Sequence, residues 1–178
     1  DIDTTATLAV AEGASVHERT GLAGLALVAT LTDREGASFG LWQPAPDTGA
    51  AQADTPGSLW WIELLSNDVD EATHFYGRVF EWQSRPTAFV PFDRYIVFER
   101  DGQQEGGLLP IGEGWEVSPS WNTIVSVGDA DEAGRLATAL GGCVHFVHTV
   151  PTAGRIAVLG DPGGAVFVVR GPVPSGPA

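Results

Sequence analysis

Three side chains stand where an acid or a base would be useful. Glu63 follows two tryptophans in an apolar run, and His145 and His148 lie three residues apart in another. Carboxylate and imidazole groups are common general acids and bases, and histidine titrates near neutral pH. Residues three apart in a strand point to opposite faces, so we expect the two histidines not to share one ion. The alternative for either histidine is a purely structural, hydrogen-bonded role.

Aromatic side chains provide the second kind of chemistry, which is binding. The chain has 6 Trp, 8 Phe and 2 Tyr, and a flat apolar wall suits a planar organic ligand that a few polar groups orient. In this scheme Trp61 forms the wall and Glu63 and Arg170 are the anchors, whereas Trp60 and Trp82 are assigned to core packing. The candidate ligand-binding residues are Trp42, Trp61, Glu63, Phe89, Phe92, Tyr95, Asn122, Ser126, Val168 and Arg170.

A repeated unit carries many of these residues. At an offset of 128 positions, residues 1–44 match residues 129–172 without a gap, with 15 identities in 44 positions. His17 falls on His145, so the simplest account of this histidine is a structural role inherited by both copies. Each copy is predicted to be a helix followed by three strands. The helices are expected at 3–11 and 129–140, and the strands near 15, at 25–31 and 37–42, and at 143–150, 155–159 and 165–170.

A similar unit lies between the two copies. Ser58–Ser66 is predicted to be an apolar strand. Asp68 can cap the following helix, which is expected to run to about Phe80 and to carry an apolar stripe. Strand alternation predicts that Ile62 and Leu64 pack on this helix. The remaining strands are expected at 82–87, 94–100, 104–109 and 121–127. Two βαβββ units in series predict an α+β fold.

The repeat also predicts the domain organisation. Residues 1–44 are the back half of a first module, 45–57 a linker, 58–173 a complete second module and 174–178 a tail. By the same offset, a front half for the first module would need roughly 70 residues ahead of Asp1. The sequence has no Met, which favours a longer parent; a chain that truly begins at Asp1 is the alternative.

Composition excludes several classes of partner. A net charge of −14 repels phosphate backbones and anionic lipids, so neither nucleic acid nor a membrane is an expected partner. The longest apolar stretch, Leu22–Leu31, is too short to span a bilayer. The single cysteine, Cys143, excludes an intramolecular disulfide and fits a cytoplasmic setting. The expected partner is a small molecule, bound by a monomer of two modules or by a homodimer.

Three phrases carry a family resemblance: WWIELLSNDVDEATHFYGRVFEW at 60–82, GRIAVLGDPGGAVFVV at 154–169 and LTDREGASFGLWQP at 31–44. The sequence resembles the vicinal oxygen chelate superfamily of glyoxalases, bleomycin-resistance proteins and extradiol dioxygenases, in its two-module actinomycete type. The resemblance implies that paired βαβββ units form a curved, mixed eight-stranded sheet around an open cleft, with helices on the outer face. It also implies a ligand or a metal inside that cleft.

The same resemblance indicates where a metal would be held. Metal-using members place ligands on the first strand of each unit and a Glu on the last strand, and these positions hold Trp61, Asn122 and Val168. Trp and Val offer no lone pair to a divalent ion, and Asn offers only a neutral oxygen. A shift in register would bring in Glu63, still without partners. We therefore expect no metal and no other cofactor.

Three functions follow from these observations, in order of preference. The first is binding of a small aromatic or polyketide-like molecule in a metal-free cleft, as in resistance or sequestration proteins. The second is a cofactor-free enzyme of secondary metabolism in which Glu63, His145 or His148 moves a proton. The third is a metal-dependent lyase or dioxygenase with part of its ligand set in the front half of the first module. Whether the protein is an enzyme stays open at this point.

Overall fold

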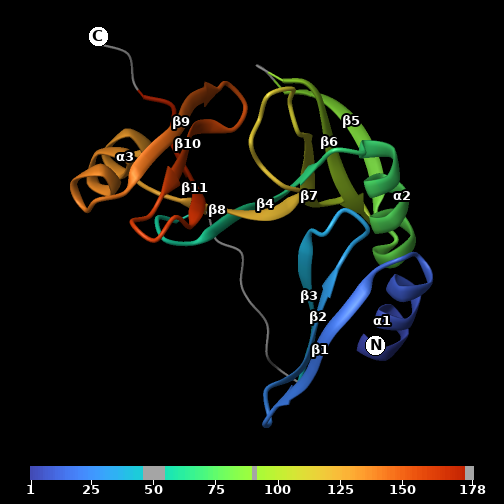
Figure 1. Cartoon of the computed structure of the whole chain (residues 1–178). Coiled ribbons are helices and arrows are strands. Elements are labelled where there is room, and N and C mark those ends of the chain that lie inside the picture. Colours follow the sequence, from blue (N-terminus) through green and yellow to red (C-terminus); the bar gives the residue numbers. More distant parts are fainter. Residues whose placement is uncertain (46–54, 90–91, 175–178) are drawn as a thin grey trace. The chain divides into compact units, whose positions relative to one another are not determined.

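The structure is a computed structural model that describes residues 1–45, 55–89 and 92–174 (Figure 1). It divides into two compact units. The first unit comprises residues 1–51, 64–87 and 94–121, and the second unit comprises residues 52–63, 88–93 and 122–178. Most of the predicted linker 45–57 and of the tail 174–178 lies outside the described residues, and the division into modules stays a prediction.

The helices and strands follow the predicted order with small shifts at their ends. The first repeat copy contains α1 (Ile2–Ala11), β1 (Ser15–Leu22), β2 (Ala26–Thr32) and β3 (Ser38–Pro44). The central unit contains β4 (Leu59–Ser66), α2 (Val69–Phe80), β5 (Gln83–Phe89), β6 (Phe92–Arg100) and β7 (Gln103–Pro110). The second copy follows β8 (Ser120–Ser126) and contains α3 (Ala130–Ala139), β9 (Cys143–Val150), β10 (Gly154–Gly160) and β11 (Val166–Gly171).

Acidic side chains begin each of the three helices in the described part of the chain. Asp68 accepts a hydrogen bond from the Glu71 amide, and Asp129 accepts one from the Glu132 amide, both at 3.0 Å. Asp1 accepts from the amides of Asp3 and Thr4 in the same way. These bonds satisfy amides of the first turn that have no partner within the helix. The predicted cap at Asp68 is confirmed.

The described strands form two sheets, a three-stranded sheet β1-β2-β3 and an eight-stranded sheet β5-β6-β7-β4-β8-β11-β10-β9. The eight-stranded sheet is mixed, because β11 runs parallel to β8 but antiparallel to β10. The predicted α+β class with a mixed eight-stranded sheet is therefore confirmed. No helix among the described ranges is long and apolar enough to cross a membrane.

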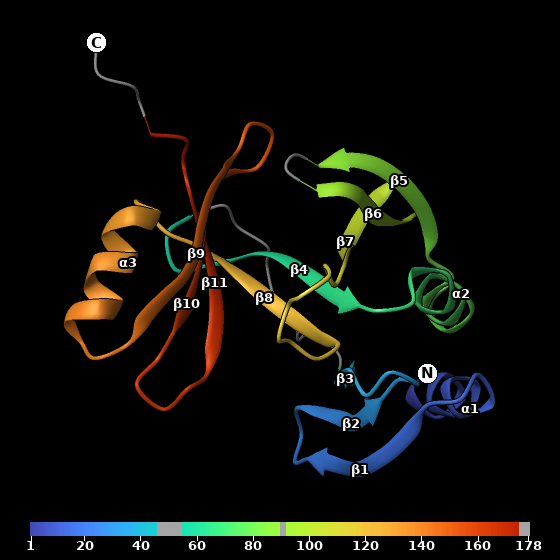
Figure 2. The same cartoon turned by 45° about the horizontal axis from the view of Figure 1, so that its top comes forward.

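In the second unit, α3 covers one face of the strands β9, β10 and β11 (Figure 2). The contact is made by small and branched apolar side chains, Ala130 of the helix with Ala157, Leu159 and Val169 of the strands. Gly134 of α3 lies so close to Val144 that an added Cβ would come within 3.2 Å of it. This face of the sheet is therefore occupied by packing, and functional side chains must lie on the other face.

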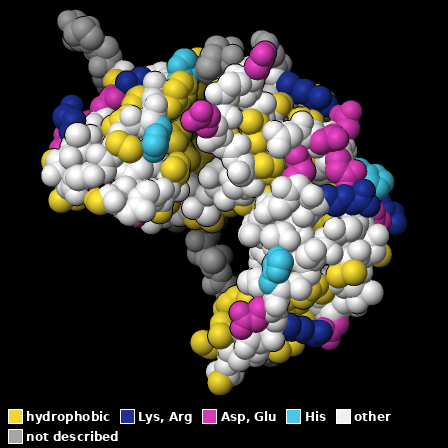
Figure 3. Space-filling view, in the orientation of Figure 1, with side chains coloured by type: hydrophobic (Ala, Val, Ile, Leu, Met, Phe, Trp, Pro, Cys, Tyr) yellow, Lys and Arg dark blue, Asp and Glu magenta, His cyan; other side chains and the backbone are white. Residues whose placement is uncertain are grey.

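In the first unit, charged side chains join α2 to the end of α1 and to the turn between β2 and β3. Arg78 of α2 contacts Glu12 at 3.3 Å, and Arg34 contacts Glu71 of α2 at 3.1 Å. Figure 3 shows acidic, basic and histidine side chains gathered over α2. Exposed pairs of this kind contribute about 0–1 kcal/mol each, so they do not account for the packing of the two helices.

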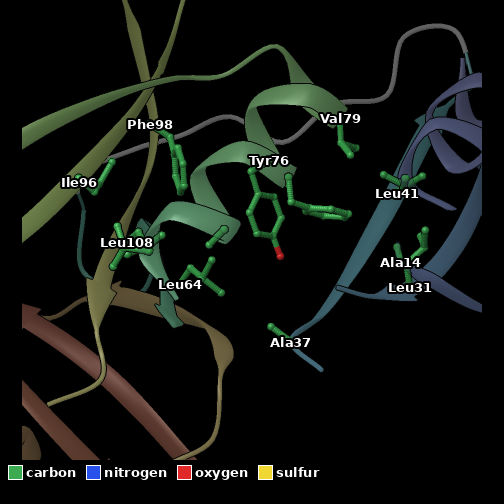
Figure 4. Packing of buried hydrophobic residues seen from close by; sticks show 14 of the residues in the cluster. Ala14, Leu31, Ala37, Leu41, Leu64, Tyr76, Val79, Ile96, Phe98 and Leu108 are labelled. Atoms are coloured by element: carbon green, nitrogen blue, oxygen red, sulfur yellow. The ribbon is translucent and has the colours of Figure 1, made fainter. Parts of the chain in front are cut away.

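The core of the first unit surrounds α2 (Figure 4). Tyr76 is fully buried, and Phe75 and Val79 are nearly so. Burial of a large apolar side chain contributes about 1.5–3 kcal/mol, so this core is the main source of stability in the unit. Residues from α1, β2, β3, β4, β6 and β7 also belong to the cluster. Those labelled in Figure 4 include Leu31, Leu41, Leu64, Ile96, Phe98 and Leu108.

The turn between β2 and β3 fixes this packing through its carboxylates. Glu35 accepts a 2.5 Å hydrogen bond from the Ser66 hydroxyl and a 3.0 Å bond from the Asn67 amide, just ahead of α2. Asp33 accepts a 2.9 Å bond from the hydroxyl of Tyr76, in the middle of α2. The first repeat copy is therefore attached to α2 and to the residues ahead of it by polar contacts, one of them buried, as well as by apolar packing.

Candidate functional site

The face of the second unit that lies away from α3 carries five of the predicted site residues, which are His145, His148, Ser126, Val168 and Arg170. Successive strand residues point to opposite faces. Because Ala157, Leu159 and Val169 face α3, their neighbours on β10 and β11 face the other way. This opposite face is called here the open face. It includes Ile156 and Val158 of β10 and Val168 and Arg170 of β11.

A row of side chains crosses the open face along the strand register. His148 of β9 pairs with Ile156 of β10, which pairs with Arg170 of β11, which pairs with Ser126 of β8. Residues directly opposite each other in neighbouring strands share a face. The pairing therefore aligns three polar side chains, those of His148, Arg170 and Ser126. Any two of them are at least 22 positions apart in the sequence.

An apolar row lies beside the polar row. Phe146 pairs with Val158, Val158 with Val168, and Val168 with Ile124. Ile124 and Val168 are buried at 4% and 8% exposure, whereas Phe146 keeps 43% of its surface exposed. The open face thus combines an apolar surface with a few polar groups, the composition typical of a site for an organic molecule.

Arg170 is held in place by two neighbours. Its guanidinium carbon lies 5.1 Å from the ring centroid of Trp60, and its Nε donates a 2.6 Å hydrogen bond to the carbonyl of Ala153. The first contact is a cation–π interaction. Gly154 gives this arrangement room, because its φ is +112° and an added Cβ would lie 2.9 Å from Arg170 Nε. A fixed positive charge therefore stands beside the apolar row.

Trp60 contacts the candidate residue Arg170, a contact that sequence reasoning missed because Trp60 was assigned to core packing. The only signal in the sequence was the Trp60–Trp61 pair itself. The two rings lie 6.1 Å apart, tilted by 46°. Trp61, the predicted wall, is half-buried, as are Glu63 and Asn122. All four residues belong to the second unit.

The expectation that His145 and His148 point to opposite faces is wrong, because β9 contains a bulge. The register with β10 shifts between Val158 and Leu159, so that His145 is an extra residue between two paired positions. A Cβ built on Gly160 would lie 2.7 Å from the Nε2 of His145, so the His145 ring is on the face to which Gly160 points. On β10, Gly160 points to the same face as Ile156, and Ile156 pairs with His148. A bulge re-aims side chains in this way. Both histidines therefore lie on the open face.

The same bulge occurs in the first repeat copy. The register of β1 shifts between Val16 and Glu18, which makes His17 the extra residue. His17 lies 2.9 Å from the hydroxyl of Thr32, whereas His145 lies 3.4 Å from the sulfur of Cys143. A bulged histidine in both copies supports the structural account for His145. His148, which has no histidine counterpart at position 20, is the better candidate for chemistry.

The remaining predicted residues lie elsewhere or are less exposed. Trp42 belongs to the first unit, where it lies on β3 and keeps 55% of its surface exposed. Tyr95 is buried at 4% exposure, and its ring covers Gly107 so closely that a Cβ there would collide with it. Phe92 begins β6 and is half-buried. Phe89 ends β5, and its side chain lies outside the described part of the structure.

The residues at the usual metal positions do not fit a metal. Trp61, Asn122 and Val168 supply at most one neutral oxygen, and divalent ions in proteins require several carboxylate, imidazole or thiolate ligands. Within residues 1–45, 55–89 and 92–174, no group of three or more His, Cys, Asp or Glu side chains could hold an ion. No chemical step is therefore derived through a metal at these positions.

Tyr76, in the first unit, has a strongly shifted pKa. Burial and the neighbouring Asp33 carboxylate raise the pKa of Tyr76 far above its ordinary value. Its hydroxyl donates to Asp33 and accepts a 2.7 Å hydrogen bond from Trp121 Nε1. Perturbed groups often mark active sites, but this hydroxyl is enclosed by aromatic rings and bonded on both sides. We interpret it as part of the core.

Comparisons with known proteins identify the family. No family model matches the sequence. A protein of Mycobacterium bovis provisionally named as a glyoxylase, CFP32, is 36% identical over 146 residues, which cover 81% of this chain and 55% of that protein. The anthracycline biosynthesis protein DauV of Streptomyces sp. strain C5 is 32% identical over 146 residues, with 82% and 53% covered. The chain thus spans about half the length of the curated relatives it matches.

Solved structures agree on the fold. The 2,3-dioxygenase LapB from Pseudomonas sp. KL28 matches with a TM-score of 0.58 at 13% identity, over 98% of this chain and 69% of that one. The 2,2',3-trihydroxybiphenyl 1,2-dioxygenase from Sphingomonas wittichii RW1 matches with a TM-score of 0.57 at 14% identity, over 95% and 65%. The fold is that of proteins built from paired βαβββ units. The chain belongs to the vicinal oxygen chelate superfamily, as its sequence predicted.

Proposed function

We propose that the protein binds a planar aromatic or polyketide-like molecule on the open face of the second unit, without a metal ion. The observation that carries the proposal is the pair of adjacent rows, one apolar and one containing Arg170. Aromatic rings gain free energy from contact with the apolar row, and a carbonyl or acidic group of the ligand is attracted to the guanidinium. Curated relatives named as anthracycline biosynthesis proteins support this class of ligand.

The proposal assigns distinct roles to the side chains. Phe146 and Val158 contact the flat face of the ligand, with the buried Val168 beneath them, and Arg170 orients its polar edge. Trp60 keeps the guanidinium in place through the cation–π contact at 5.1 Å. Because Trp61 and Asn122 lack the donors that a divalent ion needs, the ligand is recognised by the protein alone.

A titration with an anthracycline, followed by the fluorescence of its fused rings, tests this proposal. The Arg170→Gln variant should weaken binding about tenfold or more, since a hydrogen bond to a charged group contributes about 1.5–3 kcal/mol. Arg155→Gln is the matched control: Arg155 lies on β10 but bonds Asp131 of α3, on the covered side. Binding should be unchanged in this variant and after dialysis against a chelator. Equal losses in both variants would reject the open face as the site.

A second candidate function is a cofactor-free enzyme acting on the same class of molecule. It is favoured by the position of His148 in the polar row with Arg170 and Ser126, where an imidazole can take or give a proton near a bound ligand. Mass spectrometry of the ligand recovered after incubation separates the two functions. Unchanged ligand supports binding alone. A product that is lost in His148→Gln or in Glu63→Gln supports the enzyme and identifies the group that moves the proton.

A further inference from the structure

A thiol and an imidazole form a pair at the start of β9. The Sγ of Cys143 lies 3.4 Å from the Nε2 of His145, which is hydrogen-bond distance for sulfur, and both side chains are exposed. An accessible thiol becomes a strong nucleophile when a base takes its proton, and histidine is the most common such base in proteins. The two side chains therefore supply the two groups that nucleophilic chemistry needs.

Gly160 of β10 makes room for this pair. It is the strand partner of Cys143 and points to the same face as Ile156, so the thiol lies on the open face. A Cβ built on Gly160 would lie 2.8 Å from the Cys143 Sγ and 2.7 Å from the His145 Nε2. Because non-bonded heavy atoms do not approach so closely, a side chain at this position would displace both groups. The contact between the thiol and the imidazole therefore depends on a glycine of the neighbouring strand.

The first repeat copy shows what the same histidine does among other neighbours. At the offset of 128 positions, the thiol, the imidazole and the glycine correspond to Ser15, His17 and Thr32. There the Nε2 of His17 lies 2.9 Å from the hydroxyl of Thr32. Because Gly160 has no hydroxyl, His145 has lost this partner and contacts the thiol instead. The shared bulge explains the position of both histidines, whereas the change of partner belongs to the second copy alone.

The pair borders the apolar row of the open face. Phe146 of that row directly follows His145, and Val158 lies two residues from Gly160 on β10, which is roughly 7 Å along a strand. On its other side Gly160 pairs with Val166, an apolar side chain that keeps 53% of its surface exposed. A planar molecule of two or three fused rings is long enough to cover this row and to touch the thiol with one edge.

We propose that Cys143 is a nucleophilic thiol, with His145 as its base, which adds covalently to conjugated carbonyl compounds such as quinones on the open face. The pairing of thiol and base stands on the local geometry alone. The place where the electrophile binds rests on the proposed function, because the molecule is held by the same apolar row. A thiolate is a soft nucleophile, so an electron-poor carbon–carbon double bond is the group that it attacks.

The addition conserves all atoms and electrons. The Nε2 of His145 takes the thiol proton while the sulfur bonds to the carbon β to the carbonyl. The π electrons of the carbon–carbon double bond move toward the carbonyl oxygen, which becomes an enolate. The imidazolium then returns the proton to that enolate. Because thiol and electrophile both remain whole in the adduct, the step needs no oxidant, reductant or leaving group.

The rate at which acrylamide, a small conjugated amide, adds to the full chain tests the pair. Cys143 is the only cysteine, so the intact mass reports this thiol directly. At neutral pH, His145→Gln should lower the rate constant at least about fivefold, whereas His17→Gln, at the equivalent bulge, should react like the parent. At about pH 10, where thiols ionise without help, His145→Gln and the parent should differ by less than about twofold. Equal rates at neutral pH would overturn the proposal, as would a difference that persists at high pH.

Transfer of the pair to the first copy tests the same idea without a change at His145, and it decides the matter if His145→Gln does not fold. In a Cys143→Ser background, Ser15→Cys is combined with Thr32→Gly, which removes the hydroxyl that His17 contacts. This thiol should add to acrylamide at neutral pH at least about fivefold faster than Ser15→Cys with Thr32 retained. Equal rates in the two variants would overturn the role given to the glycine and the imidazole.

A planar electrophile separates this inference from the proposed function. The rate of addition of naphthoquinone should saturate with its concentration, and Phe146→Ala should lower that rate at least about fivefold more than it lowers the rate with acrylamide. A naphthoquinone rate that rises linearly and does not depend on Phe146, with the acrylamide results as expected, would support the paired thiol and overturn binding on the open face. Saturation with no dependence on His145 would support the binding surface and overturn the paired thiol.

Discussion

Replacing Tyr76 by phenylalanine should destabilise the first unit far more than the loss of one oxygen atom suggests. The hydroxyl is fully buried, donates a 2.9 Å hydrogen bond to Asp33 and accepts a 2.7 Å bond from Trp121 Nε1. The ring would stay in place, packed edge-on against Phe75 with centroids 4.9 Å apart. Tyr76→Phe therefore removes two hydrogen bonds while it keeps the apolar packing.

The magnitude follows from the groups left behind. A hydrogen bond to a charged acceptor contributes about 1.5–3 kcal/mol, and a buried donor without a partner costs about 1–3 kcal/mol. Trp121 is only half-buried, so its N–H can turn partly to water and the second cost is at the low end. We expect a loss of about 2–4 kcal/mol, which corresponds to a fall in Tm of very roughly 5–15 °C for a chain of this size.

Urea unfolding followed by circular dichroism measures this loss, with two aspartates as a matched comparison. Asp33→Asn should cost at least about 1 kcal/mol more than Asp161→Asn. Both carboxylates accept a 2.8 Å bond from the amide four residues on, at Ala37 and Ala165, but Asp161 is exposed and bonds no tyrosine. The double variant Tyr76→Phe with Asp33→Asn should lose less than the sum of the two single variants. A Tyr76→Phe protein within about 0.5 kcal/mol of the parent, or strict additivity, would refute the reasoning.

Three further predictions concern both units. Gly154→Ala should lower the free energy of unfolding by about 2 kcal/mol or more, because φ at this residue is +112° and an added Cβ would collide with the Gly171 carbonyl. Urea unfolding measures this loss, and a variant as stable as the parent would contradict the close approach. Hydrogen bonds from Arg155 lower the pKa of Asp131, so Asp131→Asn should be less stable than the parent at neutral pH. That difference should shrink as pH falls through the lowered pKa and the native carboxylate is protonated, which thermal unfolding at a series of pH values would show; a difference independent of pH would exclude this carboxylate as its cause. Glu35→Gln should reduce stability by about 1–2 kcal/mol, because Glu35 accepts hydrogen bonds from the Ser66 hydroxyl and the Asn67 amide. Calorimetry measures the change, and an unchanged stability would show that these bonds have no net stabilising effect.

Local patterns explain how much of the fold could be predicted. The apolar stripe of α2 and its Asp68 cap lie within one turn or two of each other, and the repeat relates residues that share a local structure. Alternation along β11 places Val168 and Arg170 on the face opposite Val169, as the period of a strand requires. These features depend on the period of a helix or a strand, which the sequence contains directly.

The candidate site depended on features that no local pattern contains. The bulge at His145 reverses the direction predicted from a simple alternation, since one extra residue changes the face of every residue beyond it. Trp60 was assigned to packing because its contact with Arg170 joins residues 110 positions apart in the sequence. In the same way, the hydrogen bonds of Tyr76 link it to partners 43 and 45 positions away.

The sequence by itself determined the repeated βαβββ units, the superfamily and the poor set of donors at the usual metal positions. These follow from residue types at fixed spacing, which are read along the chain. Only the tertiary structure decided that His148, Arg170 and Ser126 form one row and that His145 shares their face. Strand pairing sets these relations, and its register is fixed by packing between distant segments.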